Sequence, residues 1–403
     1  MKIGYSYWGY LGDIKYDTDG NVVSTPDGNA FYSWSIIYQL MKDGHDVYQI
    51  MPNRDYTGFN KDGKHLFSSW CKEQRCFAYQ NMIHMYDDLT VDLCWSKIQK
   101  SDLFSIWDNN GLDKCDIILH EWRMEVIGRN DARTKSFVTN GDLPENNYQP
   151  DLFIQYCLFD YASIKKIPVI IFDLDYKLDI NRISKLSLYN DIWIFELGNK
   201  WEHSCAKSKH VEIPFAFDYI NELKVIDNPF YNLVYIGNRY ERDWCIDKYI
   251  PIEMSDVCIY GNWLESGRDS QDRWPNIIFY KRLQTAEMYD VYSDSVATVL
   301  LAKKEYLENS FMTARIIESV FYGCVPLFIE EYGGDCINKY AGIYANELTV
   351  RSKSDIIDRV YFFRYNNEYR RKCIQYLREH LKFMDVRNFV SNIYDIVNTI
   401  EDN

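Results

Sequence analysis

Apolar runs with the character of strands alternate with amphipathic helical runs along this chain, and this alternation restricts the possible folds more than any other feature. Residues 2–8 form a buried-strand pattern, residues 30–41 carry apolar side chains at the i, i+3, i+4, i+7 spacing of a helix, and residues 47–51 form a second apolar run. Gly44 follows the helical run, where glycine readily adopts the left-handed conformation that ends a helix. A strand–helix–strand unit of this kind predicts a parallel sheet.

The same alternation continues in two blocks. In the first block, strand-like runs lie at 117–119, 168–172 and 192–195, with a helical run at 152–165. The stretch Pro214–Asp218 interrupts the pattern. After it we expect strands at 233–236, 257–260, 277–280, 295–301 and 325–329, and helices at 311–322, 353–363, 368–382 and 387–400. The sequence therefore predicts an α/β protein with two sheet domains, residues 1–220 and 221–385, followed by a final helical segment over 386–403.

The charge and cysteine content exclude some classes of protein. The chain carries 45 basic and 59 acidic residues, a formal net charge of −14, which argues against broad nucleic-acid binding, although a local basic patch could still hold phosphates. The 11 cysteines are scattered without a CxxC pair, as expected for reduced thiols in a cytosol. The first residues lack a long apolar run, and no stretch approaches the roughly 20 apolar residues of a membrane span. We therefore expect a cytoplasmic protein with no membrane partner.

One segment late in the second block carries the most specific motif. It reads Thr313-Ala-Arg315-Ile-Ile-Glu318 and continues through Gly323 to Pro326 before an apolar strand. This arrangement resembles the donor-site helix of GT-B glycosyltransferases, in which a Glu is followed by a Gly after five residues and a Pro after three more. The resemblance implies a GT-B fold, with two Rossmann-like parallel-sheet domains facing a central cleft. The N-terminal domain would hold the acceptor and the catalytic groups, the C-terminal domain would bind a UDP-sugar donor, and the final helix would pack back on the N-terminal domain.

The resemblance also assigns residues to the donor site. The Glu318 carboxylate would accept hydrogen bonds from the ribose hydroxyls, because its two oxygens suit a vicinal diol. Many retaining members carry a second Glu seven residues earlier, whereas this sequence reads Glu308-Asn309-Ser310-Phe311 in that region, so the position of that acid is open. A divalent metal is not expected, since GT-B members bind the diphosphate with Arg, Lys and helix N-termini. The remaining donor-site candidates are Gly12, Gly237, Asn238, Arg239, Arg242, Gly261, Trp263, Arg282, Thr313 and Arg315.

Some of these candidates have equally simple structural explanations. Arg239, Arg242 and Arg282 would face the diphosphate if they bind donor, and each would otherwise be an ordinary surface residue. Trp263 would stack on the base or, as an equal alternative, pack inside the domain.

The first domain supplies the candidates for the general base. The acceptor hydroxyl must lose its proton as it attacks the anomeric carbon, and a carboxylate or an imidazole can take that proton. His120 and Glu121 are favoured, because the run Ile-Ile-Leu before them places both at a strand end. Asp173 and Asp175 follow the next strand and Asp13 follows the first, although acidic residues at strand ends also serve purely structural roles.

The acceptor is predicted from a second, looser resemblance. The size, the architecture and the lack of a membrane anchor are similar to those of bacteriophage glycosyltransferases that modify 5-hydroxymethylcytosine in DNA, which implies glucose or a pentose such as arabinose as the transferred sugar. The loop after Glu121 contains Arg123, Arg129 and Arg133, which could hold DNA phosphates, with Trp122 against an extruded base. The alternative for this loop is a mixed-charge surface segment.

Two other functions stay open. A bacterial enzyme of surface-polysaccharide synthesis would share the scaffold, but that class often carries a basic amphipathic helix that faces the membrane, and the first domain shows no convincing one. A non-catalytic protein that binds a nucleotide or a sugar on the same scaffold is the second alternative. Turnover of the donor would distinguish an enzyme from this non-catalytic binding protein.

Overall fold

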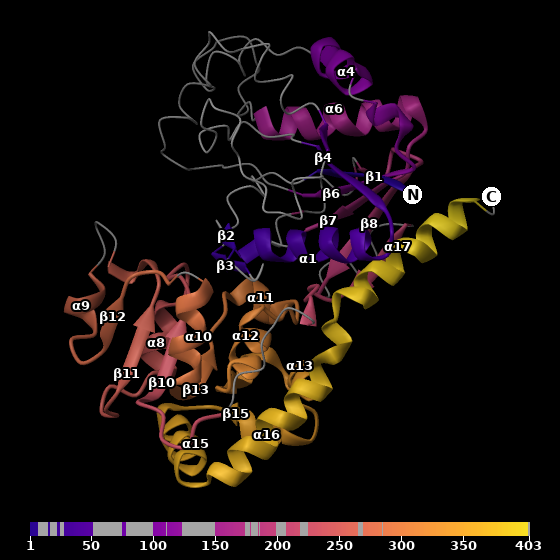
Figure 1. The fold of residues 1–403 in the computed structure, drawn as a ribbon. Coiled ribbons are helices and arrows are strands. Elements are labelled where there is room, and N and C mark those ends of the chain that lie inside the picture. Colours follow the sequence, from indigo (N-terminus) through magenta and orange to yellow (C-terminus); the bar gives the residue numbers. More distant parts are fainter. Residues whose placement is uncertain are drawn as a thin grey trace. The chain divides into compact units, whose positions relative to one another are not determined.

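The computed structural model (Figure 1) describes residues 1–6, 15–16, 22–24, 28–50, 75–77, 100–109, 111–122, 150–173, 178, 184, 186–198, 207–217, 225–264, 269–283 and 285–401. The chain divides into two compact units. Unit 1 comprises Met1–Gly20, Thr25–Pro214 and Val386–Asn403, and unit 2 comprises Asn21–Ser24 and Phe215–Asp385. The last helix of the chain therefore belongs to the same unit as the first strand.

Unit 1 is built on a parallel sheet of seven strands in the order β5-β4-β1-β6-β7-β8-β9. The chain order reverses between β1 and β6, so the switch point of this sheet lies between these two strands. The strands are β1 (Lys2–Ser6), β4 (Asp46–Ile50), β5 (Arg75–Phe77), β6 (Ile117–Glu121), β7 (Val169–Phe172), β8 (Ile192–Leu197) and β9 (Ser208–Val211).

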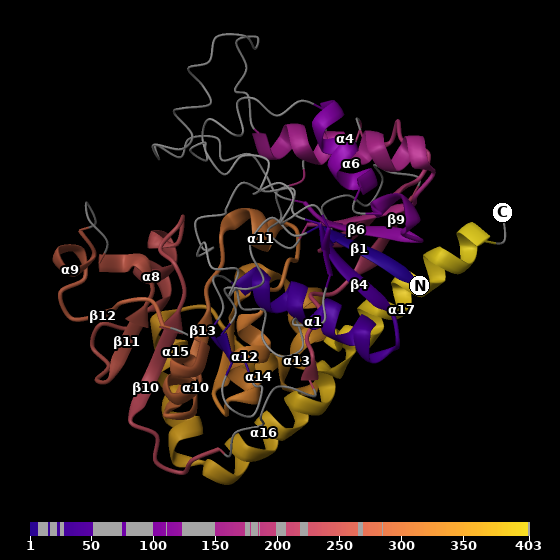
Figure 2. The same ribbon diagram turned by 45° about the horizontal axis from the view of Figure 1, so that its top comes forward.

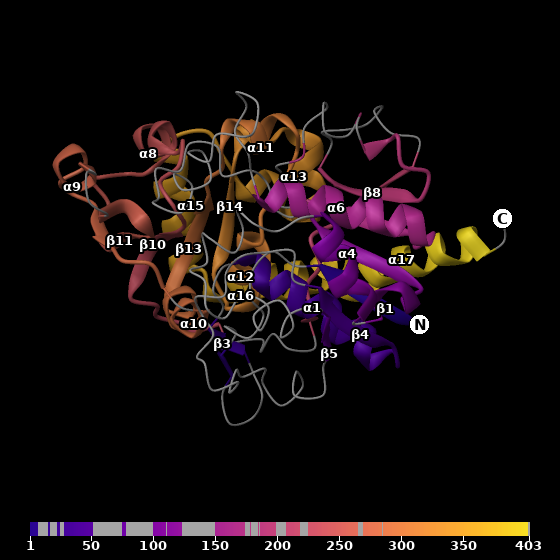
Figure 3. The same cartoon turned by 90° about the horizontal axis from the view of Figure 1, so that it is seen from above.

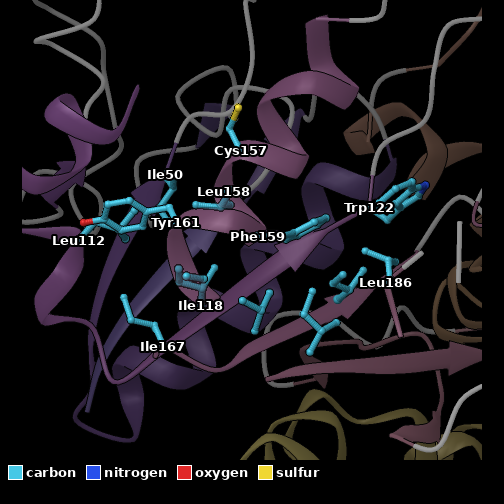
Figure 4. Close-up of a cluster of buried hydrophobic side chains, with 14 of the residues drawn as sticks. Ile50, Leu112, Ile118, Trp122, Cys157, Leu158, Phe159, Tyr161, Ile167 and Leu186 are labelled. Atoms are coloured by element: carbon cyan, nitrogen blue, oxygen red, sulfur yellow. The ribbon is translucent and has the colours of Figure 1, made fainter. Parts of the chain in front are cut away.

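Helices cover both faces of this sheet, which explains why its strands read as nearly continuous apolar runs. One face packs against α4 (Lys100–Asn109) and α6 (Pro150–Lys165), where Ile118, Ile171 and Phe159 belong to one buried cluster (Figure 4). The other face packs against α1 (Gly28–Lys42) and α17 (Val386–Glu401). A short helix, η2 (Leu112–Lys114), precedes β6.

The contact between α17 and the sheet is made by an aromatic ring. Phe389 is 3% exposed and meets the rings of Phe172 and Phe195 edge-on, at centroid distances of 5.6 and 5.1 Å. In the middle of α17, Tyr394 donates a hydrogen bond to Asp43 (2.7 Å), just after α1. Residues at the end of the chain thus complete the core of unit 1.

Unit 2 is built on a parallel sheet of six strands in the order β12-β11-β10-β13-β14-β15. The order reverses between β10 and β13, which sets the switch point of this second sheet. The strands are β10 (Tyr231–Ile236), β11 (Val257–Tyr260), β12 (Ile278–Tyr280), β13 (Ser295–Leu300), β14 (Val325–Ile329) and β15 (Thr349–Val350).

The helices of unit 2 again pack on both faces of its sheet, and Figure 2 shows α12 and α16 next to each other. They are α8 (Asp243–Tyr249), η4 (Asn262–Leu264), α9 (Ser270–Arg273), α10 (Thr285–Ser293), α11 (Lys304–Glu308), α12 (Arg315–Phe321), η5 (Glu330–Tyr332), α13 (Gly334–Ala341), η6 (Gly342–Tyr344), α14 (Ala345–Leu348), α15 (Lys353–Tyr365), α16 (Asn367–His380) and η7 (Leu381–Met384). Two short strands, β2 (Lys15–Tyr16) and β3 (Val22–Ser24), precede α1.

The predicted α/β architecture with two parallel sheets is confirmed, but the predicted helix over 311–322 is too long. The chain first forms α11, which ends at Ser310 in the left-handed conformation (φ 51°). The N–H groups of Ser310 and Phe311 donate to the carbonyls of Leu307 and Tyr306 (3.2 and 2.8 Å), the pattern that closes a helix. Helix α12 therefore begins only at Arg315.

In the parts of the chain that the structure describes, no helix has both the length and the apolar character required to cross a bilayer.

Replacing Phe389 by Ala is expected to destabilise unit 1 by about 3–5 kcal/mol, because a buried ring is lost between two others and a cavity is left. Chemical denaturation followed by circular dichroism should show the unfolding of unit 1 at lower denaturant concentration, with little change for unit 2. Ser391→Ala, at an exposed position on the same helix, is the control. Equal midpoints for both variants would show that α17 does not contribute to the core.

Candidate functional site

The switch point of unit 2 brings together most of the predicted donor-site residues that the structure describes. Open parallel sheets bind ligands outside the carboxyl ends of their strands, where the strand order reverses. In unit 2 this place is the end of β10 at Ile236, followed by Gly237, beside the end of β13 at Leu300.

Two glycines at this edge allow the backbone segments after β10 and β11 to approach closely. Gly261 has a φ of +147°, and a Cβ added to it would collide with the carbonyl group of Gly237. The same carbonyl accepts a hydrogen bond from the indole N–H of Trp263 (2.6 Å), while the Gly237 N–H donates to the carbonyl of Tyr260 (2.9 Å). Gly261 therefore requires glycine for steric and conformational reasons, whereas a Cβ on Gly237 would meet only the side chains of Tyr235 and Arg315.

Arg315 lies directly beside Gly237. A Cβ on Gly237 would lie 2.6 Å from the Arg315 Nη2. The Arg315 Nε donates to the carbonyl of Ile236 (2.6 Å), Nη1 donates to the Thr313 hydroxyl (3.3 Å), and the guanidinium lies 5.4 Å from the ring centre of Tyr235. The side chain is partly exposed and makes no ion pair within 4 Å with a carboxylate of the described residues. A guanidinium is thus fixed at the end of β10, and its Nη2 group makes no hydrogen bond with the described residues.

Glu318 lies one helical turn after Arg315, so both side chains are on the same side of α12. Its side chain is partly exposed, and the carboxylate makes no hydrogen bond within the described parts of the chain. Desolvation by the surrounding protein raises the pKa of Glu318, and the nearby positive charge of Arg315 opposes that shift. A carboxylate that is costly to desolvate and makes no hydrogen bond within the described residues is suited to binding a ligand.

The other predicted arginines of unit 2 have different environments. Arg239 forms a two-point contact with Asp243 (2.7 and 2.6 Å) and an ion pair with Asp269 (2.8 Å), so its guanidinium is engaged by carboxylates and not free for a diphosphate. Arg242 is buried and donates to backbone carbonyls, including those of Tyr240 (3.0 Å) and Leu301 (3.4 Å). It ties the loop after β10 to the end of β13.

The remaining donor-site candidates are placed as follows. Trp263 is fully buried and stacks on Phe279, with ring centres 5.7 Å apart at 29°, so it is a packing residue and its ring is not available to a base. Asn262 accepts a hydrogen bond from the Arg239 N–H (2.8 Å), whereas Asn238 and the exposed Arg282 lie in the loops after β10 and β12. Gly12 lies outside the described residues.

The switch point of unit 1 holds His120, the favoured general base. The ring is fully buried between Ser6 and Gln155, with Nδ1 3.0 Å from the Ser6 Oγ and Nε2 2.7 Å from the Gln155 Oε1. With the amide placed this way, Nε2 carries the proton and the Ser6 hydroxyl donates to Nδ1. Burial lowers the pKa of His120 to about 4. The ring is neutral at pH 7, and the lone pair on its Nδ1 already accepts the hydrogen bond from the Ser6 hydroxyl.

Two predicted carboxylates lie on neighbouring strands of unit 1. Glu121 is buried at the end of β6 and accepts a hydrogen bond from the Ser33 hydroxyl of α1 (2.9 Å). Asp173 is buried just after β7 and accepts a hydrogen bond from the Leu178 N–H. Glu196 on β8 is also buried and was missed by sequence reasoning, because a single acid inside an apolar strand gives no distinctive pattern. Asp13 and Asp175 lie outside the described residues.

Trp122, predicted to contact an extruded base, is fully buried in the core of unit 1. Its ring is parallel to that of Phe159 on α6, 6.4 Å away, as Figure 4 shows. The apolar indole therefore stabilises the contact between the sheet and α6 and is not exposed to a nucleic acid. Arg123, Arg129 and Arg133 lie outside the described residues.

No protein-family model and no curated protein matches the sequence. Among solved structures, the chain is similar to HepE from Anabaena in complex with UDP-glucose, at 9% identity over 99% of this chain and 100% of that one, with a TM-score of 0.54. It is also similar to a mutant O-GlcNAc transferase from Thermobaculum terrenum, at 10% identity over 98% of this chain and 66% of that one, with a TM-score of 0.52. The fold is GT-B.

The GT-B fold gives the Arg315–Glu318 pair its chemical context. A guanidinium can neutralise a phosphate, and a neighbouring carboxylate can accept hydrogen bonds from a diol. Among the described residues, no group of three or more His, Cys, Asp or Glu side chains is arranged to hold a metal ion.

His120 provides a test of the buried unit 1 site. Because its pKa falls from 6.5 in the unfolded chain to about 4 in the folded protein, the folded state binds fewer protons between these values. The stabilisation is complete above pH 6.5 and is lost as the pH falls towards 4, by on the order of 3 kcal/mol. Nitrogen NMR of the imidazoles should show a neutral His120 ring at pH 5. A ring that protonates near pH 6.5 would contradict the buried Ser6–His120–Gln155 arrangement.

Proposed function

We propose that this protein transfers a sugar from a UDP-sugar to a hydroxyl acceptor. The observation that carries the proposal is the pair formed by Arg315 and Glu318, beside Gly237 at the switch point of the unit 2 sheet. Within the described residues, this place offers a cation, a carboxylate that makes no hydrogen bond, and a glycine after the strand that lets the cation lie close to the backbone. A nucleoside diphosphate needs these three features.

In the proposed complex, Arg315 contacts the diphosphate and Glu318 accepts hydrogen bonds from the ribose. Gly237 allows the Arg315 guanidinium to lie close to the backbone at the end of β10, because a Cβ at this position would be 2.6 Å from the Arg315 Nη2. The complex of HepE with UDP-glucose, a protein of the same fold, supports a UDP-sugar as the donor. Arg315 would supply the positive charge that a divalent cation supplies elsewhere, so we expect activity in the presence of EDTA.

During transfer, the acceptor oxygen forms a bond to the anomeric carbon while the bond from that carbon to the diphosphate oxygen breaks. UDP leaves with the electron pair, and Arg315 stabilises the charge that develops on it. The acceptor proton passes to a base, for which Glu121 and Asp173 are the described carboxylates proposed from unit 1. His120 is a weaker candidate than the sequence indicated, because Ser6 already donates to its Nδ1. Asp13 and Asp175, which lie outside the described residues, stay predicted candidates for this base.

The acceptor predicted from sequence, 5-hydroxymethylcytosine in DNA, depends on residues that the structure does not describe or places elsewhere. Arg123, Arg129 and Arg133 belong to the first group, and the buried Trp122 belongs to the second. The DNA acceptor therefore stays one candidate beside a saccharide.

Replacing Glu318 by Ala is expected to weaken UDP binding roughly 10- to 150-fold, because charge-assisted hydrogen bonds worth about 1.5–3 kcal/mol are lost. Isothermal titration calorimetry of UDP measures the effect. Glu253→Ala removes a similar charge from an exposed position of unit 2 and should leave the affinity unchanged. Equal UDP affinity of the Glu318→Ala variant and the wild type would remove Glu318 from the nucleotide site.

Incubation of the protein with a panel of UDP-sugars tests the transfer itself. One donor should release UDP faster when an acceptor is present, and mass spectrometry should show one added sugar on the acceptor. Duplex DNA containing 5-hydroxymethylcytosine and neutral oligosaccharides are the two acceptor classes to compare. Tight UDP binding without any UDP release would instead indicate a non-catalytic binding protein.

A further inference from the structure

Unit 2 contains a hollow of about 750 Å³ that the proposed donor site does not use. Its walls are the loop of residues 239–241, the residues Asp243, Trp244 and Asp247 of α8, Arg273 of α9 and Lys304 of α11. We call it the α8 hollow. Figure 3 shows α8 and α9 on the side of the unit 2 sheet where β10 and β11 lie. Arg315, Glu318 and Gly237 do not line it, so it is a separate feature of the unit 2 surface.

The charged groups along one wall form a chain of ion pairs. Arg239 joins Asp269 to Asp243 (2.8 and 2.6 Å), and Arg273 joins Asp243 to Asp247 (2.8 and 2.5 Å). The hydrogen bonds from Arg239 lower the pKa of Asp243, so this carboxylate stays ionised. Alternating donors and acceptors are therefore presented to the hollow at fixed positions.

The side chain of Trp274 supports this chain of ion pairs. The guanidinium groups of Arg239 and Arg273 lie 5.3 and 4.7 Å from the centre of its ring, and its N–H donates to Asp247 (2.8 Å). Trp274 itself is buried. Side chains fixed in this way lose little conformational entropy when a ligand binds.

The lining has no net charge. Three cationic side chains, Arg239, Arg273 and Lys304, are matched by three anionic ones, Glu241, Asp243 and Asp247. A phosphate or a DNA backbone would meet three carboxylates here, which disfavours it. A neutral ligand with many hydroxyls would instead find both hydrogen-bond donors and acceptors.

Aromatic surface completes the lining. Tyr240 is 50% exposed and Trp244 is partly exposed, and the buried indole N–H of Trp244 has no hydrogen-bond partner among the described residues. Flat apolar rings next to fixed polar groups are typical of sites that orient small polar ligands. The C–H face of a sugar ring suits such an aromatic surface.

The backbone of the loop gives a second, independent indication. Glu241 has a φ of +53°, a conformation that is unfavourable for a residue with a side chain, and its side chain is exposed. Arg242 holds this loop by donating hydrogen bonds to the carbonyls of Asn238 and Tyr240 (3.2 and 3.0 Å). Backbone strain of this kind persists where the surroundings impose it and is concentrated at ligand sites.

We propose that the α8 hollow binds a neutral saccharide, and that this saccharide is part of the acceptor. Saccharide binding is inferred from the hollow alone, whereas the role of the saccharide as acceptor rests on the proposed sugar transfer. The acceptor class inferred in this way is a glycan and not DNA.

The first experiment applies the full-length protein to an array of neutral and acidic oligosaccharides and to duplex DNA containing 5-hydroxymethylcytosine. Binding to one or more neutral oligosaccharides is expected. Tyr240→Ala should weaken it at least tenfold, whereas Tyr365→Ala, which removes an exposed ring elsewhere in unit 2, should not. Absence of binding to every neutral oligosaccharide, or equal binding by the Tyr240→Ala variant, would overturn the proposal.

A salt titration separates a saccharide site from an anion site. The affinity for the neutral oligosaccharide should change less than twofold as the salt concentration rises, because a neutral ligand has no net charge to be screened. Preferential binding of acidic oligosaccharides or DNA that salt abolishes would identify an anion site and overturn the proposal.

UDP affinity and UDP release without acceptor report on the donor site alone and should be the same in wild type and Tyr240→Ala. In the presence of the identified oligosaccharide, the variant should show a higher acceptor KM with little change in kcat. If no UDP-sugar is turned over but Tyr240→Ala still abolishes saccharide binding, the transfer proposal fails and the saccharide site stands. If transfer proceeds with an acceptor KM that Tyr240→Ala does not raise, the assignment of the hollow to the acceptor fails.

Discussion

The close approach of Gly261 to the carbonyl of Gly237 is the constraint on which the site in unit 2 depends. It brings the segments after β10 and β11 together without side chains between them. The space left beside Gly237 is then filled by the guanidinium of Arg315, which the Ile236 carbonyl fixes at the strand end. Arg242 completes the arrangement by tying the loop after β10 to Leu301 at the end of β13. The local geometry of the switch point thus follows from two residues that have no side chain.

The sequence predicted the two sheets because the apolar periodicity of a strand or a helix is a local property. It also singled out Arg315 and Glu318, whose spacing within one helical turn is visible in the sequence. The environments of Arg239, Trp263 and Trp122 could not be predicted in the same way. Arg239 meets Asp269, Trp263 meets Phe279 and Trp122 meets Phe159, and each of these partners is 16 to 37 positions away. Burial and pairing of such residues depend on tertiary packing, which overrides what the residue type alone suggests.

The two ligand-binding regions proposed in unit 2 differ in their electrostatics, so we expect them to bind different kinds of ligand. At the switch point, the partly exposed Arg315 guanidinium makes no ion pair with a carboxylate of the described residues, so the local field favours an anion. In the α8 hollow, the guanidinium groups are already neutralised by aspartates, so hydrogen bonding and ring contacts determine what binds. A protein with a formal charge of −14 can in this way concentrate its affinity for phosphate at one place.

The position of α17 has a consequence for the order in which the protein folds during synthesis. Unit 2 is complete once the ribosome has passed residue 385, whereas the sheet of unit 1 lacks the helix that covers Phe172 and Phe195 until residues 386–401 have been made. Domains of a nascent chain usually fold from the N-terminus onwards. Here the last of the two cores to close is the one that contains β1, so the apolar surface of Phe172 and Phe195 stays uncovered until α17 has been made.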